Sequence, residues 1–272
     1  MLRLLLVAFC VLVGCHRQAP PAETRIVAIG SAVTETLYAL GAGDRVVGVD
    51  TSSLYPEAAT KLPQVGYQRS ISAEGILALK PTLILAGSDA GPAAAIDQLR
   101  AAGVKVEQLD GAPTVDGARG RIERIAGIVG KDPKPVVARL DADVAKIPAV
   151  TTAPKVLAIY ARGGGTLNVF GSACVTDTMI GLAGGKNAVT GFPGSKPLTA
   201  EALVQAAPDF ILVPSRGLEG LGGAEGLLRV PGVAETPAGR ARHFVAIDDL
   251  LLLSAGPRMG QGASELARKL AP

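Results

Sequence analysis

Short apolar runs alternate with helical stretches along most of this chain. Residues 25–30, 46–49 and 83–86 consist mainly of Ile, Val, Leu, Ala and Gly, and such runs are typical of strands buried in a parallel sheet. The stretches between them begin with Ser or Thr, which cap helices, and end near Gly or Pro, which terminate them. This alternation predicts an α/β fold, with helices on both faces of a mostly parallel sheet.

The pattern changes between residues 115 and 147. No strand pattern occurs there, and apolar residues recur at helical spacing, with a break indicated by Gly130 and Pro133. Strand–helix alternation resumes at residues 155–160. We therefore predict two Rossmann-like lobes with parallel sheets, joined by a single long helical strut, with a ligand in the cleft between the lobes. A stiff strut also predicts that the lobes move little on binding. The predicted units are an N-terminal α/β lobe (25–113), a connecting helix (114–148) and a C-terminal α/β lobe (149–272).

Two sequence patterns of the first lobe recur in the second. Residues 34–43 (TETLYALGAG) are repeated in outline at 176–185 (TDTMIGLAGG), and residues 72–86 are repeated more closely at 199–213. Two similar lobes favour a cleft between them. Residues 50–71 have no counterpart in the second lobe, so this segment is the first candidate for function.

The first 24 residues resemble an export signal followed by a tether. Residues 4–13 form an apolar run that is too short to cross a bilayer as a helix, and Arg3 supplies the positive charge before it. Leu-Val-Gly-Cys at 12–15 resembles the cleavage motif of bacterial lipoproteins, which predicts a signal peptide at 1–14, lipidation of Cys15 and a tether at 15–24. The alternative is an ordinary signal peptide with an incidental cysteine. The first interpretation predicts a periplasmic, extracytoplasmic protein that contacts the membrane through its lipid anchor alone.

Composition argues against several classes of function. The 27 Lys and Arg residues are scattered and nearly balanced by 24 Asp and Glu residues, which argues against a nucleic-acid interface. With two histidines the chain lacks the ligands of a His-rich zinc or manganese site. It contains no nucleophile elbow, P-loop or zinc-protease motif, so we predict that it is not an enzyme. The alternative from another class is an exported thiol enzyme that uses Cys174 with His243.

Two regions carry a resemblance to a known family. They are residues 50–75, which include Gly66-Tyr67-Gln68-Arg69, and the C-terminal segments 217–223, 231–239 and 248–252. These regions resemble the haem-binding periplasmic proteins of bacterial haem ABC importers, and the likeness extends over nearly the whole mature chain. Cobalamin and ferric-siderophore binding proteins share the plan of two lobes and a strut, so they are the alternative within the same fold.

The resemblance implies that haem b is a transported ligand. In that family the tyrosine of the Gly-Tyr-x-Arg segment supplies the axial oxygen to ferric haem, which makes Tyr67 the expected ligand of the haem iron. Fe(III) suits an anionic oxygen, and a nearby cation such as Arg69 favours the phenolate. Arg216 corresponds best to an arginine that the second lobe can place on the opposite haem face. Some members place a histidine in the second lobe; residues 171–176 contain none, although Cys174 lies there.

Glu74 and Glu201 occupy the same place in the two repeats, each in the first turn of a predicted helix. A carboxylate there also interacts favourably with the helix dipole, so a purely structural role is the alternative. In the related importers one glutamate from each lobe pairs with arginines of the permease dimer, and the resemblance implies that docking role for these two residues. The implied partners are haem and an ABC permease dimer with its ATPase, and the chain is expected to be a monomer.

Overall fold

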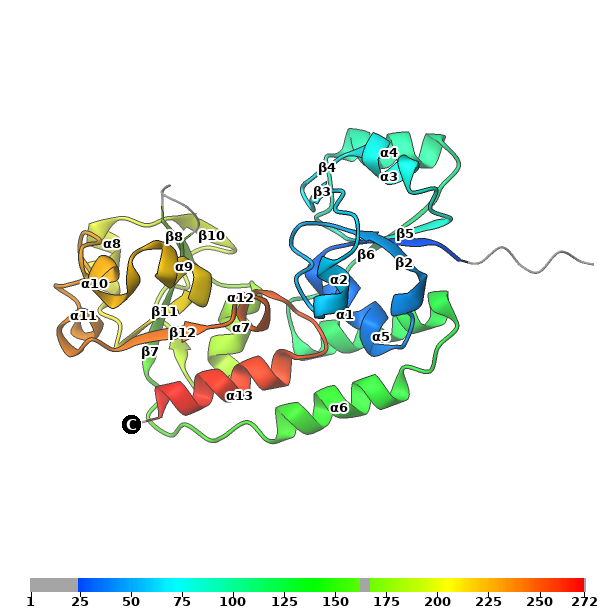
Figure 1. Cartoon of the computed structure of the whole chain (residues 1–272). Helices are drawn as coiled ribbons and strands as arrows, with labels where there is room; N and C mark the ends of the chain where they lie inside the picture. Colours follow the sequence, from blue (N-terminus) through cyan, green and yellow to red (C-terminus); the bar gives the residue numbers. More distant parts are fainter. Residues whose placement is uncertain (1–23, 162–166, 272) are drawn as a thin grey trace, which may run out of the picture.

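The first lobe is built on a four-stranded parallel sheet with the order β2-β1-β5-β6. The computed structural model describes residues 24–161 and 167–271, and Figure 1 shows this sheet in the lobe nearer the N-terminus. The central strand β1 is buried along its whole length, which explains its continuous apolar run. The strands are β1 (Ile26–Ile29), β2 (Val46–Val49), β5 (Leu83–Gly87) and β6 (Lys105–Leu109).

Helices cover both faces of this sheet. Ile26 and Ala28 belong to the apolar cluster under α1 and α5, whereas Val27 and Ile29 belong to the cluster under α3 and α4, because successive side chains of a strand point to opposite faces. These helices are α1 (Ser31–Ala39), α3 (Ala73–Ala78), α4 (Ala93–Ala101) and α5 (Val115–Val129). The shorter elements are the 3-10 turn η1 (Gly43–Arg45), α2 (Glu57–Thr60), β3 (Gly66–Tyr67) and β4 (Ser70–Ile71).

Two helices, α5 and α6 (Lys134–Ala145), occupy the predicted connecting segment. α5 ends at Gly130, whose φ of 68° is left-handed and therefore suits glycine, and Pro133 precedes the first turn of α6. The segment is thus interrupted where the sequence indicates a break. α6 runs beneath the first lobe to the junction with the second (Figure 1), where its C-terminal end packs against the start of α13 (Met259–Leu270). Residues 146–154 then lead into the second lobe without helix or strand.

The second lobe contains a mixed sheet with a parallel centre. Strand β11 lies between β7 and β12 and is parallel to both, whereas β8 and β10 add an antiparallel edge and β9 pairs with β7. The strands are β7 (Lys155–Tyr160), β8 (Asn168–Phe170), β9 (Lys186–Asn187), β10 (Ser195–Pro197), β11 (Phe210–Pro214) and β12 (Phe244–Ile247). The remaining helices are α7 (Val175–Leu182), α8 (Ala200–Ala206), α9 (Ser215–Gly220), α10 (Gly223–Leu228), α11 (Pro237–Ala241) and α12 (Asp249–Leu253).

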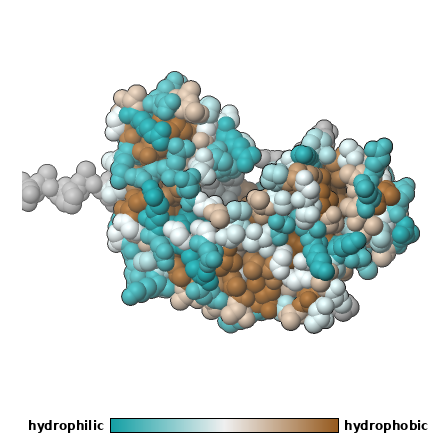
Figure 2. Space-filling model, turned by 180° about the vertical axis from the view of Figure 1, so that it is seen from behind, coloured by the Kyte–Doolittle hydropathy of each residue, from teal (hydrophilic) through white to brown (hydrophobic). Residues whose placement is uncertain are grey.

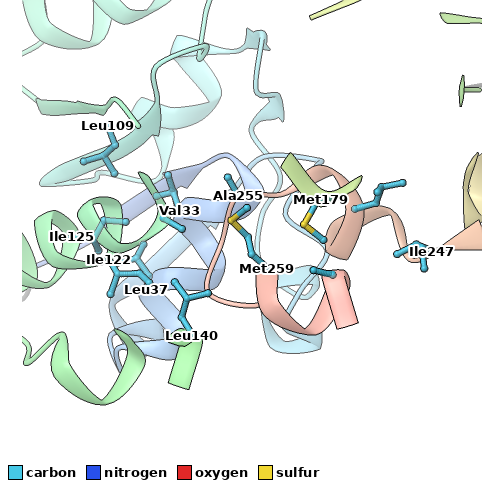
Figure 3. Packing of buried hydrophobic residues seen from close by; sticks show 14 of the residues in the cluster. Val33, Leu37, Leu109, Ile122, Ile125, Leu140, Met179, Ile247, Ala255 and Met259 are labelled. Atoms are coloured by element: carbon cyan, nitrogen blue, oxygen red, sulfur yellow. The ribbon is translucent and has the colours of Figure 1, made fainter. Parts of the chain in front are cut away.

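One apolar cluster continues from the first lobe into the second. Leu37 of α1 belongs to it, and so do Met179 of α7 and Met259 of α13 (Figure 3). At the same junction the buried carboxylate of Glu35 accepts a hydrogen bond from Arg258 at 2.9 Å. Apolar packing and a buried ion pair therefore join the lobes. No helix in the described ranges is both long and apolar enough to cross a membrane.

Candidate functional site

A two-stranded hairpin, β3–β4, carries Tyr67 and Arg69. Tyr67 pairs with Ser70 across the hairpin, so Gln68 and Arg69 form its turn. Gly66 has a φ of 100°, and a β-carbon there would stand 2.7 Å from the carbonyl oxygen of Ser70. A glycine is therefore required immediately before Tyr67 if the hairpin is to close.

Backbone hydrogen bonds hold this hairpin against the rest of the first lobe. The amide of Thr51 donates to the carbonyl of Gly66, and the amide of Ile71 donates to the carbonyl of Gly91, both at 2.9 Å. Gly91 in turn donates to the carbonyl of Gln68 at 2.9 Å. The apolar side chain of Ile71 is buried in the cluster under α3 and α4. These contacts place Tyr67 on a fixed element, as a precise ligand site requires.

The carboxylate of Asp50 anchors the start of the segment that leads to the hairpin. It follows β2 and is buried, and it accepts hydrogen bonds from the Gly30 amide at 2.8 Å and the Ser53 hydroxyl at 2.6 Å. Its other oxygen accepts from the amide and the hydroxyl of Ser52, at 2.9 and 2.5 Å. Asp50 thus ties the carboxyl end of β1 to the segment that has no counterpart in the second lobe.

Arg69 forms an ion pair with Asp89, which follows β5. Its Nη2 and Nε atoms donate to Oδ2 of Asp89 at 2.8 and 3.1 Å, and Nε2 of Gln68 donates to the same oxygen at 3.1 Å. The hydrogen bond with Asp89 is the main cause of a raised pKa at Arg69, and the side chains of Tyr67 and Tyr160, when ionised to phenolates, add weaker attractions. Arg69 therefore lies within electrostatic range of one phenol from each lobe.

Tyr160 and Arg216 stand at the carboxyl ends of parallel strands in the second lobe. Tyr160 is the last residue of β7, and its ring meets that of Phe170 edge-on at 5.8 Å between centroids. Arg216 follows β11 in the first turn of α9, is exposed, and donates its backbone amide to Asp249 at 3.1 Å. The carboxyl edge of an α/β sheet is where ligands bind. Figure 2 shows that the molecular surface is hollowed between the two lobes.

The predicted docking residues lie at corresponding helix starts. Glu74 is in the first turn of α3, where the Ser72 hydroxyl accepts from the Gly75 amide at 3.1 Å. Glu201 is in the first turn of α8, where Thr199 caps the helix by accepting from the Ala202 amide at 3.2 Å. Both glutamates are exposed, and in the described part of the chain neither carboxylate forms an ion pair. Both helices lie on the side of the molecule away from α6 (Figure 1).

The thiol of Cys174 lacks the surroundings of a nucleophile. It donates to the carbonyl of Gly171 at 3.5 Å, and burial raises its pKa, which disfavours the reactive thiolate. His243 instead stacks on Phe210 with a centroid distance of 4.9 Å. Within residues 24–161 and 167–271 no group of three or more His, Cys, Asp or Glu residues could hold a metal ion. Cys15, the predicted lipidation site, lies outside the described residues.

Sequence reasoning missed three residues of this region: Asp50, Asp89 and Tyr160. Asp89 and Tyr160 each stand at or just after the carboxyl end of a strand. That position is the signal that singles out Arg216, and it could have identified these two as well. Asp50 begins the segment 50–71 that the sequence marks as the first candidate for function, but no local pattern predicts the four hydrogen bonds that give it a structural role.

Two solved structures are similar over nearly the whole chain. The periplasmic heme-binding protein RhuT from Roseiflexus sp. RS-1, in apo form, is 42% identical with a TM-score of 0.87, over 91% of this chain and 98% of that one. The periplasmic heme-binding protein BhuT in complex with two hemes is 42% identical with a TM-score of 0.84, over 90% of this chain and 97% of that one.

Sequence comparison places residues 26–251 in a family described as periplasmic binding protein. An uncharacterized ABC transporter substrate-binding lipoprotein of Bacillus subtilis, YvrC, is 31% identical over 257 residues, which are 91% of this chain and 80% of that protein. The vitamin B12-binding protein of Yersinia pestis is 40% identical over 106 residues, which are 39% of this chain and 37% of that protein. These relatives are substrate-binding proteins and not enzymes, in agreement with the prediction of no catalysis.

Proposed function

This chain belongs to the periplasmic binding protein family, and from that premise we propose that it captures haem b outside the cytoplasm and delivers it to an ABC importer. The observation that carries the proposal is the fixed hairpin that holds Tyr67 beside the cation of Arg69. A phenolate beside a guanidinium suits ferric iron, a hard metal ion that favours anionic oxygen. The two solved relatives that are named heme-binding proteins support the choice of cargo.

Tyr67 supplies the axial oxygen, and Arg69 makes its ionised form more favourable. Asp89 orients the Arg69 guanidinium through the 2.8 Å ion pair between its Oδ2 and Nη2 of Arg69. The guanidinium carries more donors than this one carboxylate oxygen can use, so it can also donate to a phenolate. Asp89 orients the cation and also offsets part of its charge.

The second lobe borders the opposite side of the bound cargo. Arg216 contacts the opposite haem face or its propionates from the carboxyl end of β11, and Tyr160 borders the same space from the end of β7. An arginine suits propionate carboxylates because its planar fork matches them. Cys174 is the alternative second ligand, although its raised pKa weighs against a thiolate.

Delivery follows from the two lobes and the anchor. Lipidation of Cys15 holds the protein at the membrane surface, and the protein acts there as a monomer. Glu74 and Glu201 engage arginines of a permease dimer that works with its ATPase. Both carboxylates are exposed at helix starts on the same side of the molecule (Figure 1). Such rim charges mainly set the encounter rate and the register of docking.

An absorbance titration of the mature protein with hemin, cobalamin and a ferric siderophore tests the cargo. We expect a saturable ferric haem spectrum with a phenolate charge-transfer band, lost in Tyr67→Phe and retained in the control Tyr38→Phe on α1. Saturable binding of cobalamin alone would favour the second candidate, which the partial match to a vitamin B12-binding protein supports. An unchanged haem spectrum in Tyr67→Phe would refute the ligand assignment.

A further inference from the structure

Arg121 of α5 is a buried cation at the seam between the two lobes. It is 9% exposed, and its Nη1 donates at 2.5 Å to the carbonyl of Ala255, which lies between α12 and α13 of the second lobe. Ala255 belongs to the apolar cluster that both lobes share (Figure 3). Within residues 24–161 and 167–271 no carboxylate forms an ion pair with Arg121. A buried charge without a counter-ion is costly, so this position is a candidate for binding an anion from outside the chain.

A glycine covers the guanidinium of Arg121. A β-carbon on Gly111 would stand 2.5 Å from Nη2 and 3.1 Å from Cζ of Arg121. Gly111 is exposed and lies two residues beyond Leu109, the last residue of β6. The carboxyl ends of the strands of an α/β sheet are where ligands bind. Because Gly111 has no side chain, only exposed backbone separates the guanidinium from that edge of the sheet.

One carboxylate attracts both Arg121 and the arginine of the hairpin. Burial lowers the pKa of Arg121, and the charge of Asp89 opposes that decrease. Asp89 is also the main cause of the raised pKa of Arg69, so both guanidinium groups lie within electrostatic range of it. Asp110, which follows β6, is exposed, and water therefore screens its charge more than that of the buried guanidinium. Two cations share the charge of Asp89, which leaves an attraction for a further anion.

We propose that Arg121 is a carboxylate-binding residue of the cargo site, and that Gly111 leaves its guanidinium accessible to a carboxylate of the cargo. The proposal rests on the haem-binding function proposed above and adds a selectivity to it. Tyr67 recognises the iron, whereas Arg121 recognises an acidic side group of the porphyrin. A guanidinium suits this role because it stays charged and its planar fork matches a carboxylate. The site then favours a cargo with free carboxylates over one whose side groups are neutral.

A structural role is the alternative for Arg121. Its hydrogen bond to Ala255 joins the lobes, and loss of this bond would change the stability of the protein whatever the cargo carries. The two roles are separated by comparing hemin, which has free carboxylates, with hemin dimethyl ester, in which they are neutral. Both are titrated in the same mild detergent. The measured quantity is the ratio of the two dissociation constants for one protein, because partial unfolding changes both constants by the same factor.

The original protein should bind hemin about tenfold more tightly than the ester, as expected for a charge-assisted hydrogen bond. Arg121→Met keeps most of the side-chain length and should lower this preference about three- to tenfold. Arg121→Lys should show an intermediate preference, because it keeps the charge but loses the planar fork. Arg124→Met on the same helix is the matched control. Arg124 is more than half exposed and pairs with Glu107, so its removal should leave the preference unchanged.

Gly111→Ala tests the same idea while keeping the arginine. Gly111 does not have the left-handed φ that disfavours a side chain, and the added methyl group would displace the end of the Arg121 side chain. This variant should lower the preference for hemin by about threefold or more. Gly120→Ala on α5 is its control, because Gly120 is exposed and a β-carbon there has no neighbour within 4 Å. If Arg121→Met does not fold, Gly111→Ala decides the question.

Metal-free protoporphyrin IX gives an independent readout by fluorescence, since it keeps the carboxylates and lacks the iron. Its binding should weaken about three- to tenfold in Arg121→Met and change less than about twofold in Tyr67→Phe. The opposite order would overturn the inference.

The ester comparison also separates this inference from the function on which it rests. If Arg121→Met and Gly111→Ala weaken the binding of hemin and of its ester equally, Arg121 has a structural role and the inference is wrong. If the original protein binds hemin and the ester equally well, the inference is wrong and the haem-binding function stands. If the original protein binds neither compound, the haem-binding function fails and the inference fails with it.

Discussion

Removing Arg258 should destabilise the protein through the buried ion pair between the lobes. Glu35 of α1 is 4% exposed, and its Oε2 accepts from Nη2 of Arg258 at 2.9 Å. The guanidinium also stacks on the ring of Tyr55, 3.5 Å from its centroid. Three buried side-chain atoms in this region lack hydrogen-bond partners: Oε1 of Glu35, Nε of Arg258 and Oγ of Ser254. The pair therefore uses one of the two parallel hydrogen bonds that an arginine and a carboxylate can form.

The expected magnitudes follow from that geometry. Arg258→Ala leaves a carboxylate buried without its cation, which costs about 3–5 kcal/mol of unfolding free energy. Loss of the stacking on Tyr55 adds about 1 kcal/mol. Glu35→Leu combined with Arg258→Met removes both charges, and should lie within about 2 kcal/mol of the original protein because no buried charge is left unpaired. The two changes are therefore expected to be strongly non-additive.

Urea unfolding followed by circular dichroism checks these values. Arg242→Ala is the matched control, because Arg242 pairs with Glu225 at 2.7 Å on the surface, with both side chains more than half exposed. That variant should leave the urea midpoint nearly unchanged. A loss below about 1 kcal/mol in Arg258→Ala, or a double variant as unstable as Arg258→Ala, would refute the view that a buried charge pair joins the lobes.

Three further predictions concern the cargo and its delivery. Arg69→Ala should raise the pH midpoint of haem ligation because the cation that favours the phenolate is gone, whereas Asp89→Asn should lower this midpoint because it frees that cation. A spectroscopic pH titration in which both variants shift the midpoint in the same direction would contradict this reasoning. Glu74→Lys with Glu201→Lys should leave haem affinity within about a few-fold while stopping transfer to the importer in vesicles, and normal transport would remove both residues from docking. Solution scattering should show little change in radius of gyration on haem binding, because α6 and the shared apolar cluster join the lobes; a large decrease would show that the lobes close widely.

Local sequence determined the main helices and strands of the first lobe and the helical connection. The continuous apolar run of β1, the caps at Ser72 and Thr199 and the left-handed Gly130 depend on residues close in the chain, so periodicity and capping rules identify them. The segment without a counterpart in the second lobe also stood out by comparison of the two halves. Its hairpin was not predicted, but the resemblance of its Gly-Tyr-x-Arg pattern to the haem-binding proteins identified Tyr67 and Arg69 as candidates, and their roles stay predictions.

Tertiary structure alone decided which distant side chains meet. Arg69 and Asp89 are 20 positions apart, and Glu35 and Arg258 are 223 positions apart, so no local pattern relates them. Gly232 lets a loop pack against the first turn of α8, about 30 residues earlier in the chain, which is a property of backbone packing. Helix and strand formation depends on near neighbours, whereas contacts between elements depend on how whole layers pack. The sequence therefore determined the elements and the expected iron ligand, and the packing of the lobes determined the partners of Arg69 and the surface around Glu201.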